Sequence, residues 1–452
     1  MSLLGGLCLS FGFLVAFPLG VAIILRMMSF YLDYILYFCV YFIHIKMDYQ
    51  TCILANGLRV IYQPDRSDVA YCGMVVNAGS RDESETEEGM AHFVEHMLFK
   101  GTSKRRSTHI INRLENVGGE MNAFTSKEET VIYAVILKDY LERAVDLIAD
   151  VTFHSVFPQK EIEKEVEVIL DEIDSYRDSP SELIYDDFED LLFSEHSLGH
   201  HILGKPELLE KYTTQDALNF TRRLYYPENM VFFVSGNIPF KKVVYWAEKY
   251  FCFDRQSEFR AERTVPGSYT PIRKNVTKGT HQVHVAVGNR AYDYYHPDRM
   301  AMHLLNNILG GPGMSSLLNL SLREKRGLVY SVDSSYQPFS DTGQWCVYFG
   351  SDEESAEKCE KLIYAELEKM RKQRISDTLL KKYKLQFQGQ MAIASENKEN
   401  LALSLGKSFL RYGKFDDLKT VQKKIEAITS EQIYRVANDI FVPEQLTVLR
   451  YN

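Results

Sequence analysis

The chain has 452 residues, enough for two or three domains, and its composition of 45% hydrophobic and 25% charged residues is that of an ordinary globular protein. The formal net charge of −9 and the lack of basic clusters argue against a nucleic-acid-binding surface, and they fit a soluble enzyme or a partner of basic peptides. The seven cysteines are scattered and include no CxxC pair, so we interpret them as free thiols in a reducing compartment.

The first 46 residues differ in composition from the rest of the chain. Residues 3–25 carry no charged side chain over 23 positions, which is long enough to span a bilayer, and a second apolar run follows at 30–45. A secretory signal fits poorly because no lysine or arginine precedes the apolar run. Two interpretations stay open: residues 1–46 are a membrane anchor, or translation begins at Met47 and the protein is cytoplasmic.

The segment after Met47 predicts alternating strands and helices. Asn56–Gly57 between two apolar runs predicts a hairpin, and the next apolar run predicts a buried strand that ends in a loop. Glu87 and Glu88 suit the positive end of a helix dipole, so we expect a helix over 87–99. The elements expected after it are a helix, a strand-like segment and two more helices, at 107–119, 120–138, 139–157 and 159–177.

A polar stretch with proline and glycine, from about 255 to 275, predicts a linker, and the order of elements then repeats. The second half predicts strands at 281–292, 329–338 and 343–352 and helices at 299–311, 315–327, 354–372 and 377–394. We therefore predict an α+β fold of two similar domains, each a mixed or antiparallel sheet with helices on one face, preceded by the apolar segment. The predicted boundaries are 1–46 for that segment, 47–258 for the first domain, 259–275 for the linker and 276–452 for the second domain.

One pentapeptide in the first half, HxxEH, carries the residue types of a metal site. His92 and His96 are four apart, so on a helix both imidazoles project from one face and can bind a single Zn²⁺. Glu95 lies on the adjacent flank, where its carboxylate could act as the general base towards a zinc-activated water. An amphipathic helix with two incidental histidines would explain the same residues, so a third ligand is needed to decide.

The predicted helix at 159–177 offers that third ligand. Glu165 and Glu172 are seven residues apart, which places both on the same helix face, two turns from each other. Glu172 lies beside the most apolar part of the helix, which favours a buried role. We interpret the other glutamates of this helix, at positions 161, 163 and 167, as solvated.

Together, the stretches "GMAHFVEHMLFKGT", "NAFTSKEETVIY" and "EVEVILDEI" resemble the pitrilysin/insulinase family, and most of all its half-size members related to mitochondrial processing peptidase. The resemblance extends over residues 47–452. It implies that Zn²⁺ is held by His92, His96 and Glu172, which follows His96 by 76 residues, with Glu165 as a supporting glutamate.

The resemblance also implies residues that contact the substrate. Asn122 and Ala123 match the family's edge strand, on which an extended peptide adds as a further strand. Phe124 would either line a side-chain pocket there or belong to the strand core. Arg323 and Tyr330 match a pair that contacts the substrate backbone and the oxyanion, for which a guanidinium and a phenol are suitable donors.

The function that the resemblance implies is a zinc metalloendopeptidase acting on peptides or unfolded segments. Full-length members enclose the substrate between two halves and this chain corresponds to one half, so we expect a homodimer or a heterodimer with a related half. Arg323 and Tyr330 would then act in their own chain or on the facing one. The alternative is a non-catalytic or partner-dependent subunit of a processing-peptidase-like heterodimer. No nucleic acid is expected as a partner, a membrane only if residues 1–46 are retained, and His200–His201 are not expected to be ligands.

Overall fold

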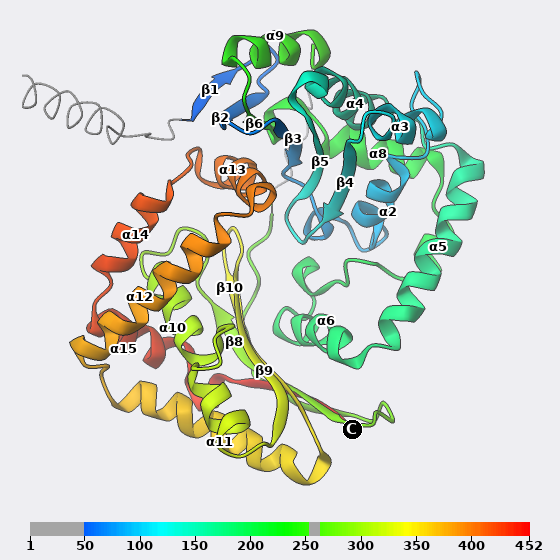
Figure 1. Cartoon of the computed structure of the whole chain (residues 1–452). Coiled ribbons are helices and arrows are strands. Elements are labelled where there is room, and N and C mark those ends of the chain that lie inside the picture. The colour runs from blue at the N-terminus through cyan, green and yellow to red at the C-terminus, as the bar shows by residue number, and fades with distance from the viewer. Residues whose placement is uncertain (1–48, 253–262) are drawn as a thin grey trace, which may run out of the picture. The chain divides into compact units, whose positions relative to one another are not determined.

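The structure is a computed structural model that describes residues 49–252 and 263–452 (Figure 1). The chain divides into two compact units, 1–48 and 49–452, and every described residue belongs to the second. Both interpretations of residues 1–46 concern a segment outside the described residues. No helix in the described part of the chain combines the length and the apolarity needed to cross a bilayer.

The first sheet has six strands, ordered β1-β2-β6-β3-β5-β4. Their bounds are β1 Gln50–Ile53, β2 Arg59–Pro64, β3 Val69–Val76, β4 Glu120–Thr125, β5 Thr130–Leu137 and β6 Met230–Gly236. Neighbouring strands are antiparallel except β2 and β6, which run parallel. β4 forms one edge of the sheet, so one side of its backbone has no partner strand among the described residues.

The second sheet has five strands, ordered β7-β11-β8-β10-β9. Their bounds are β7 Arg273–Val276, β8 Val283–Ala291, β9 Val329–Pro338, β10 Gly343–Ser351 and β11 Thr447–Tyr451. Only β7 and β11 run parallel. Apart from β1, the two sheets have the same strand order and the same single parallel pair, so the predicted repeat of one α+β unit is confirmed.

Most helices of each half pack on one face of its own sheet and form a separate core with it. Those of the first core are α2 Met90–Met97, α3 Ser107–Glu115, α4 Leu141–His154, α5 Gln159–Arg177, α7 Pro206–Leu209, α8 Thr214–Leu224 and α9 Phe240–Tyr250. Those of the second core are α10 Arg299–Gly310, the π-helical η5 Asn319–Glu324, α11 Glu353–Lys372, α12 Asp377–Ala394, α14 Leu418–Ala427 and α15 Ser430–Ile440.

A helix from the other half covers the opposite face of each sheet (Figure 1). α6 (Pro180–Leu192) belongs to the first half, and its Ile184 and Phe188 pack on Ala286 of the second sheet. α13 (Lys398–Tyr412) belongs to the second half and packs on the first sheet. The central strands of both sheets are thus buried on both faces, which explains their nearly continuous apolar sequences.

α13 approaches the first sheet at a glycine. Leu405 and Phe409 of α13 are buried with Val75 and Phe233 of the sheet. A Cβ on Gly406 would lie 2.5 Å from Phe233 and 2.9 Å from Val75, so only glycine allows the helix this close. This contact fixes α13 over β3 and β6.

Three local expectations differ from the structure. The helix expected over 87–99 begins at Met90, because Glu87 and Glu88 lie in the turn before it. The strand-like segment 120–138 is a hairpin of β4 and β5 with a charged turn between them. The helix expected over 315–327 is largely the π-helical η5. Residues 263–272, within the predicted linker, form no helix or strand, and β7 then begins at Arg273.

Candidate metal centre

The helix that carries HxxEH is fixed at its N-terminus by a carboxylate and two glycines. The backbone N–H groups of Gly89 and Ala91 donate to Glu83 at 2.9 and 2.7 Å, which satisfies donors that a helix leaves unpaired in its first turn. Gly89 has a φ of 96°, in the left-handed region that favours glycine. A Cβ on Gly89 would lie 2.8 Å from Cα of Gly204, so the two chain segments meet backbone to backbone.

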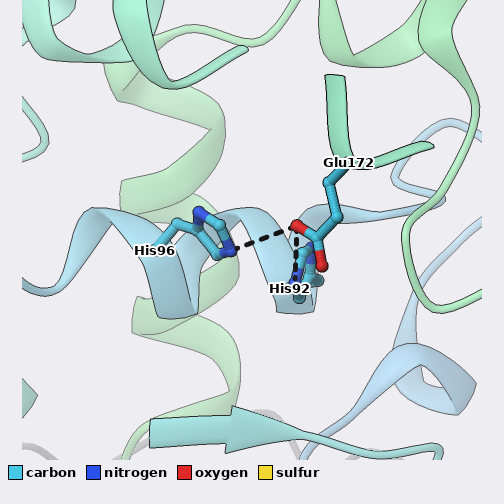
Figure 2. A group of neighbouring side chains, drawn as sticks. All are labelled: His92, His96 and Glu172. Carbon is cyan, nitrogen blue, oxygen red and sulfur yellow. Dashed lines mark ion pairs between the residues drawn. The ribbon is translucent and has the colours of Figure 1, made fainter. Parts of the chain in front are cut away.

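Two histidines of α2 and one glutamate of α5 converge on one point (Figure 2). Oε2 of Glu172 lies 3.9 Å from Nε2 of His92 and 3.6 Å from Nε2 of His96. The ring centroids of the two histidines are 4.5 Å apart. One ligand atom from each residue lies within 4.8 Å of the others, and no other such group of His, Cys, Asp and Glu occurs in the described ranges.

The expectation that Glu172 is buried is wrong, since 44% of its side chain is exposed. The next residue, Ile173, belongs to the apolar face of α5 and is buried in the core. Glu172 instead projects from α5 towards the histidines (Figure 2). The cluster is therefore closed by α2 on one side and open to solvent on the glutamate side. An open position is what a catalytic zinc site needs and a structural one lacks.

Glu165, one heptad before Glu172, is buried and holds His96 from behind. Its Oε1 lies 2.9 Å from Nδ1 of His96, and its Oε2 lies 2.5 Å from Nζ of Lys100. Burial opposes ionisation of Glu165, but the hydrogen bonds from His96 and Lys100 prevail and lower its pKa. The carboxylate therefore accepts from Nδ1 and leaves Nε2 of His96 free to face Glu172.

Glu95 lies beside the cluster, in contact with the edge strand of the sheet. Oγ1 of Thr125, the last residue of β4, donates to Oε2 of Glu95 at 3.2 Å. Burial raises the pKa of Glu95, and the charge of Glu172 adds to this shift. A partly buried carboxylate with a raised pKa, next to candidate metal ligands, has the properties of a general base.

The pKa values of the two histidines are shifted in opposite directions. Burial, together with the charge of His96, lowers the pKa of His92 to about 3, so His92 is a neutral imidazole. Burial would also lower the pKa of His96, but the hydrogen bond to Glu165 and the nearby carboxylates raise it. Nδ1 of His92 is buried and has no hydrogen-bond partner among the described residues.

The donor set fits Zn²⁺. Two imidazole nitrogens and one carboxylate oxygen are the ligands of many catalytic zinc sites, with metal–ligand distances of about 2.0–2.2 Å. Two atoms bound tetrahedrally at about 2.1 Å from one ion are roughly 3.4 Å apart. The separations of 3.6 and 3.9 Å between Glu172 and the histidines are close to this value. Small side-chain adjustments would suffice to bind an ion.

The predicted substrate strand lies next to this cluster. Ala123 packs towards the first core, whereas Phe124 packs in the cluster that α13 forms with the opposite face. Nζ of Lys407 in α13 lies 4.5 Å from the centroid of the Phe124 ring. Phe124 is therefore part of the packing under α13, as in the strand-core interpretation. Asn122 is exposed and lies opposite Tyr133 of β5 in the sheet.

Arg323 and Tyr330 lie together in the second half, and no contact of theirs reaches the cluster in the described part of the chain. The guanidinium of Arg323 lies 5.8 Å from the ring centroid of Tyr330. Nε of Arg323 forms its ion pair with Glu324, at 3.9 Å. Tyr330 is 83% exposed, which is unusual for a tyrosine at the start of a strand.

His200 and His201 do not join the metal cluster. Nε2 of His201 lies 3.3 Å from Asp187, and Nε2 of His200 lies 3.7 Å from Glu88. Both line a cavity of about 550 Å³ beside the C-terminal end of α5.

Comparisons with known proteins show the family to which this chain belongs. Residues 59–206 match the model described as insulinase (peptidase family M16), and residues 211–387 match the model described as peptidase M16 inactive domain. The solved structure of a protease from Helicobacter pylori has a TM-score of 0.82 and 24% identity, covering 90% of this chain and 99% of its own. A Pseudomonas fluorescens structure described as a peptidase M16 inactive domain has a TM-score of 0.83 and 21% identity, covering 89% of this chain and 97% of its own.

Several relatives are similar over nearly their whole length. An "Uncharacterized zinc protease" of Rickettsia felis is 31% identical, over 88% of this chain and 96% of its own. A zinc protease of Bacillus subtilis is 31% identical over 87% of this chain and 96% of its own, and one of Mycobacterium leprae is 34% identical over 86% and 88%. The chain belongs to the insulinase family, peptidase family M16, and at the level of that family it is a zinc metallopeptidase.

Sequence reasoning missed three side chains around the cluster. Lys100 is four residues after His96, so helical spacing could have indicated that it faces Glu165. Thr125 could not be paired with Glu95, because nothing in the sequence shows that β4 ends beside α2. Glu83 could have been recognised as a helix cap only once the start of α2 was known.

Proposed function

We propose that this protein is a zinc-dependent metalloendopeptidase that hydrolyses peptides or unfolded segments. The observation that carries the proposal is the convergence of His92, His96 and Glu172 within 4.8 Å, with Glu95 on the neighbouring flank. Three ligands with an open side, and a separate carboxylate, are the parts that metal-assisted hydrolysis requires. Membership of family M16 and the names of the relatives support the same reading.

Each residue of the cluster has a role in this proposal. A bound Zn²⁺ supplies Lewis-acid chemistry, because it acidifies water and polarises the carbonyl of a peptide bond. Glu95 accepts the proton of the attacking water at its carboxylate, which Thr125 orients through the 3.2 Å hydrogen bond. Glu165 keeps His96 in the tautomer and orientation that present Nε2 to the ion.

The exposed edge of β4 supports the proposed substrate class. An extended peptide can add to this strand through main-chain hydrogen bonds, which require no particular side chain. Asn122 and Ala123 lie on this strand, shortly before Thr125, whose hydroxyl donates to Glu95. Such a site suits an unfolded segment and excludes a folded helix, whose backbone groups are already paired.

The experiment is a comparison of wild type with Glu95→Gln. We expect the purified protein to contain one Zn²⁺ per chain and to cleave a quenched peptide, and a chelator to abolish cleavage. Glu95→Gln should keep the zinc and lower kcat by about 10³-fold, in the range that loss of a general base produces. Metal analysis measures the zinc, and unchanged hydrolysis by this variant would refute the assignment of the base.

We also propose that the protein works as a dimer in which Arg323 and Tyr330 serve a bound substrate. The exposure of Tyr330 and its proximity to Arg323 support a role at a surface that a substrate or a second chain covers. Sedimentation analysis gives the oligomeric state. Mixing inactive Glu95→Gln chains with inactive Arg323→Ala chains tests the roles, since activity returns only if the two sites complement each other across chains.

A further inference from the structure

The turn that joins β4 to β5 is unusual because it is charged and buried. Lys127, Glu128 and Glu129 are only 2%, 6% and 2% exposed. Charged side chains are rarely buried to this extent unless they are paired. Each of the three is paired with a group outside its own hairpin.

The first two partners come from several elements around the turn. Nζ of Lys127 lies 2.9 Å from Glu189 of α6, the helix that packs on the second sheet. Glu128 accepts from the guanidinium of Arg81 at 2.7 Å and from the hydroxyl of Ser340 at 2.6 Å. Ser340 belongs to the turn between β9 and β10, so the corresponding hairpins of the two halves meet at their tips.

Among the described residues, the ion pairs of Glu129 are with α13. Nζ of Lys407 lies 2.8 Å and Nη2 of Arg411 lies 2.7 Å from its Oε1, so two cations of one helix hold one buried carboxylate. The aliphatic part of Lys407 also brings its ammonium to 4.5 Å from the Phe124 ring centroid. α13 of the second half thus binds the turn of the β4–β5 hairpin in the first half.

This turn leads directly to the candidate general base. The backbone carbonyl of Glu129 accepts from both N and Oγ of Ser126, at 2.9 and 3.0 Å. The residue before Ser126 is Thr125, which donates to Glu95. A displacement of Glu129 therefore moves Ser126 and, with it, the hydroxyl that orients Glu95.

α13 contacts the same hairpin a second time, nearer its middle. Tyr133 of β5, which lies opposite Asn122 of β4 in the sheet, donates to Oε1 of Glu399 at 2.8 Å. Glu399 lies in the first turn of α13. One helix of the second half therefore contacts this hairpin both at its turn and near its middle.

We infer that α13 is a positioning element for the substrate strand β4, and that Lys407 and Glu129 are positioning residues for Glu95. This inference rests on the proposed peptidase function. The second half, part of which matches the model described as peptidase M16 inactive domain, would then contribute to hydrolysis within its own chain, because α13 places a strand and a hydroxyl.

The chain offers a matched control for this inference. Lys398, also in α13, pairs with Asp65 at 2.9 Å. Asp65 directly follows β2, which lies near the edge of the sheet opposite to β4. Lys398→Met and Lys407→Met each remove one ion pair between α13 and the first half. Only Lys407→Met removes one from the hairpin.

We expect Lys407→Met to lower kcat/KM for a quenched peptide by about tenfold or more, as a small misplacement of reacting groups does. Zinc content should stay at the wild-type value. Lys407→Arg, which keeps the charge, should restore most of the activity, and Lys398→Met should remain within about twofold of wild type.

A second measurement does not depend on activity. Amide hydrogen exchange of the segment 120–130 should be faster in Lys407→Met than in wild type and unchanged in Lys398→Met. If Lys407→Met and Lys398→Met changed activity and hydrogen exchange equally, the inference would be overturned. The ion pairs of α13 would then contribute only to the general stability of the protein. If the wild-type protein shows no zinc-dependent hydrolysis, the proposed function is contradicted. The hydrogen-exchange measurement would then still test whether the contacts of α13 stabilise the β4–β5 hairpin.

Discussion

The two halves of the molecule share a strand order but not a chemistry. α2 and α10 occupy corresponding places after the third and eighth strands, yet α2 carries HxxEH and α10 carries a single histidine, His303. His303 packs against Tyr336, with ring centroids 4.7 Å apart, and burial lowers its pKa to about 4. The repeat therefore shows that the fold supplies the scaffold, and that the ligands belong to particular residues placed on it.

The helices that follow show the same contrast. α5 buries Glu165 and projects Glu172 towards α2, whereas in α12, its counterpart, Leu380 is the only buried residue. α12 exposes large apolar side chains instead, at Leu385 and Ile393. In the first half, α5 thus completes the candidate metal cluster. In the second half, the corresponding helix α12 lies largely at the surface.

The largest expected effect comes from removing a ligand in the first half. His96→Ala deletes one of two imidazoles, and with it the partner of Glu165 and Glu172, so stoichiometric Zn²⁺ and peptide hydrolysis should both be lost. His303→Ala, at the corresponding helix of the second half, should change neither. Zinc retained by His96→Ala at the wild-type level would contradict the ligand set.

A smaller effect is expected behind the ligands. Glu165→Gln keeps the size of the side chain but removes the charge that holds Nδ1 of His96 and Nζ of Lys100. Affinity for zinc or activity should fall by about 10- to 100-fold, the range found for groups that orient metal ligands. Competition with a chromogenic chelator measures the affinity, and a value equal to that of wild type would show that Glu165 does not orient His96.

The smallest effect distinguishes α12 and α13, consecutive helices of the second half, by the sign of a stability change. Gly→Ala within a helix is normally stabilising by up to about 1 kcal/mol. Gly389→Ala in α12 should follow this rule, because nothing lies within 4 Å of the added Cβ. Gly406→Ala in α13 should instead destabilise the protein by about 1–3 kcal/mol, since its Cβ would meet Phe233 at 2.5 Å.

Chemical denaturation measures both variants of this pair. Phe233 cannot move aside easily, because its ring also lies close to Gly73, where an added Cβ would be 2.5 Å from it. A stabilising effect of Gly406→Ala would mean that α13 lies farther from the sheet than the structure has it.

The local elements around the site could be predicted from the sequence because their signals are local. The apolar period of residues 159–177 predicted α5 with the bounds that the structure has, and this helix carries both Glu165 and Glu172. The spacing within HxxEH likewise predicted that His92 and His96 share a face. Both inferences need only the geometry of a single helix.

The remaining features depend on which elements meet. The apolar positions of α6 and α13 show that each helix has a buried face, but not that each is buried on the sheet of the other half. The exposure of Glu172 depends on the position of α5 relative to α2, and the hydrogen bond from Thr125 depends on where β4 ends. Long-range contacts of this kind leave no periodic signal in the sequence.

The exchange of α6 and α13 has a consequence for how this polypeptide can be divided. If the two halves were made as separate molecules, each would lack the helix that shields one side of its sheet, and Ile61, Val75 and Phe233 would face water. Neither product would be a self-sufficient module, despite their matching architectures. The repeat has therefore become a single cooperative unit, in which each copy is needed to complete the other's interior.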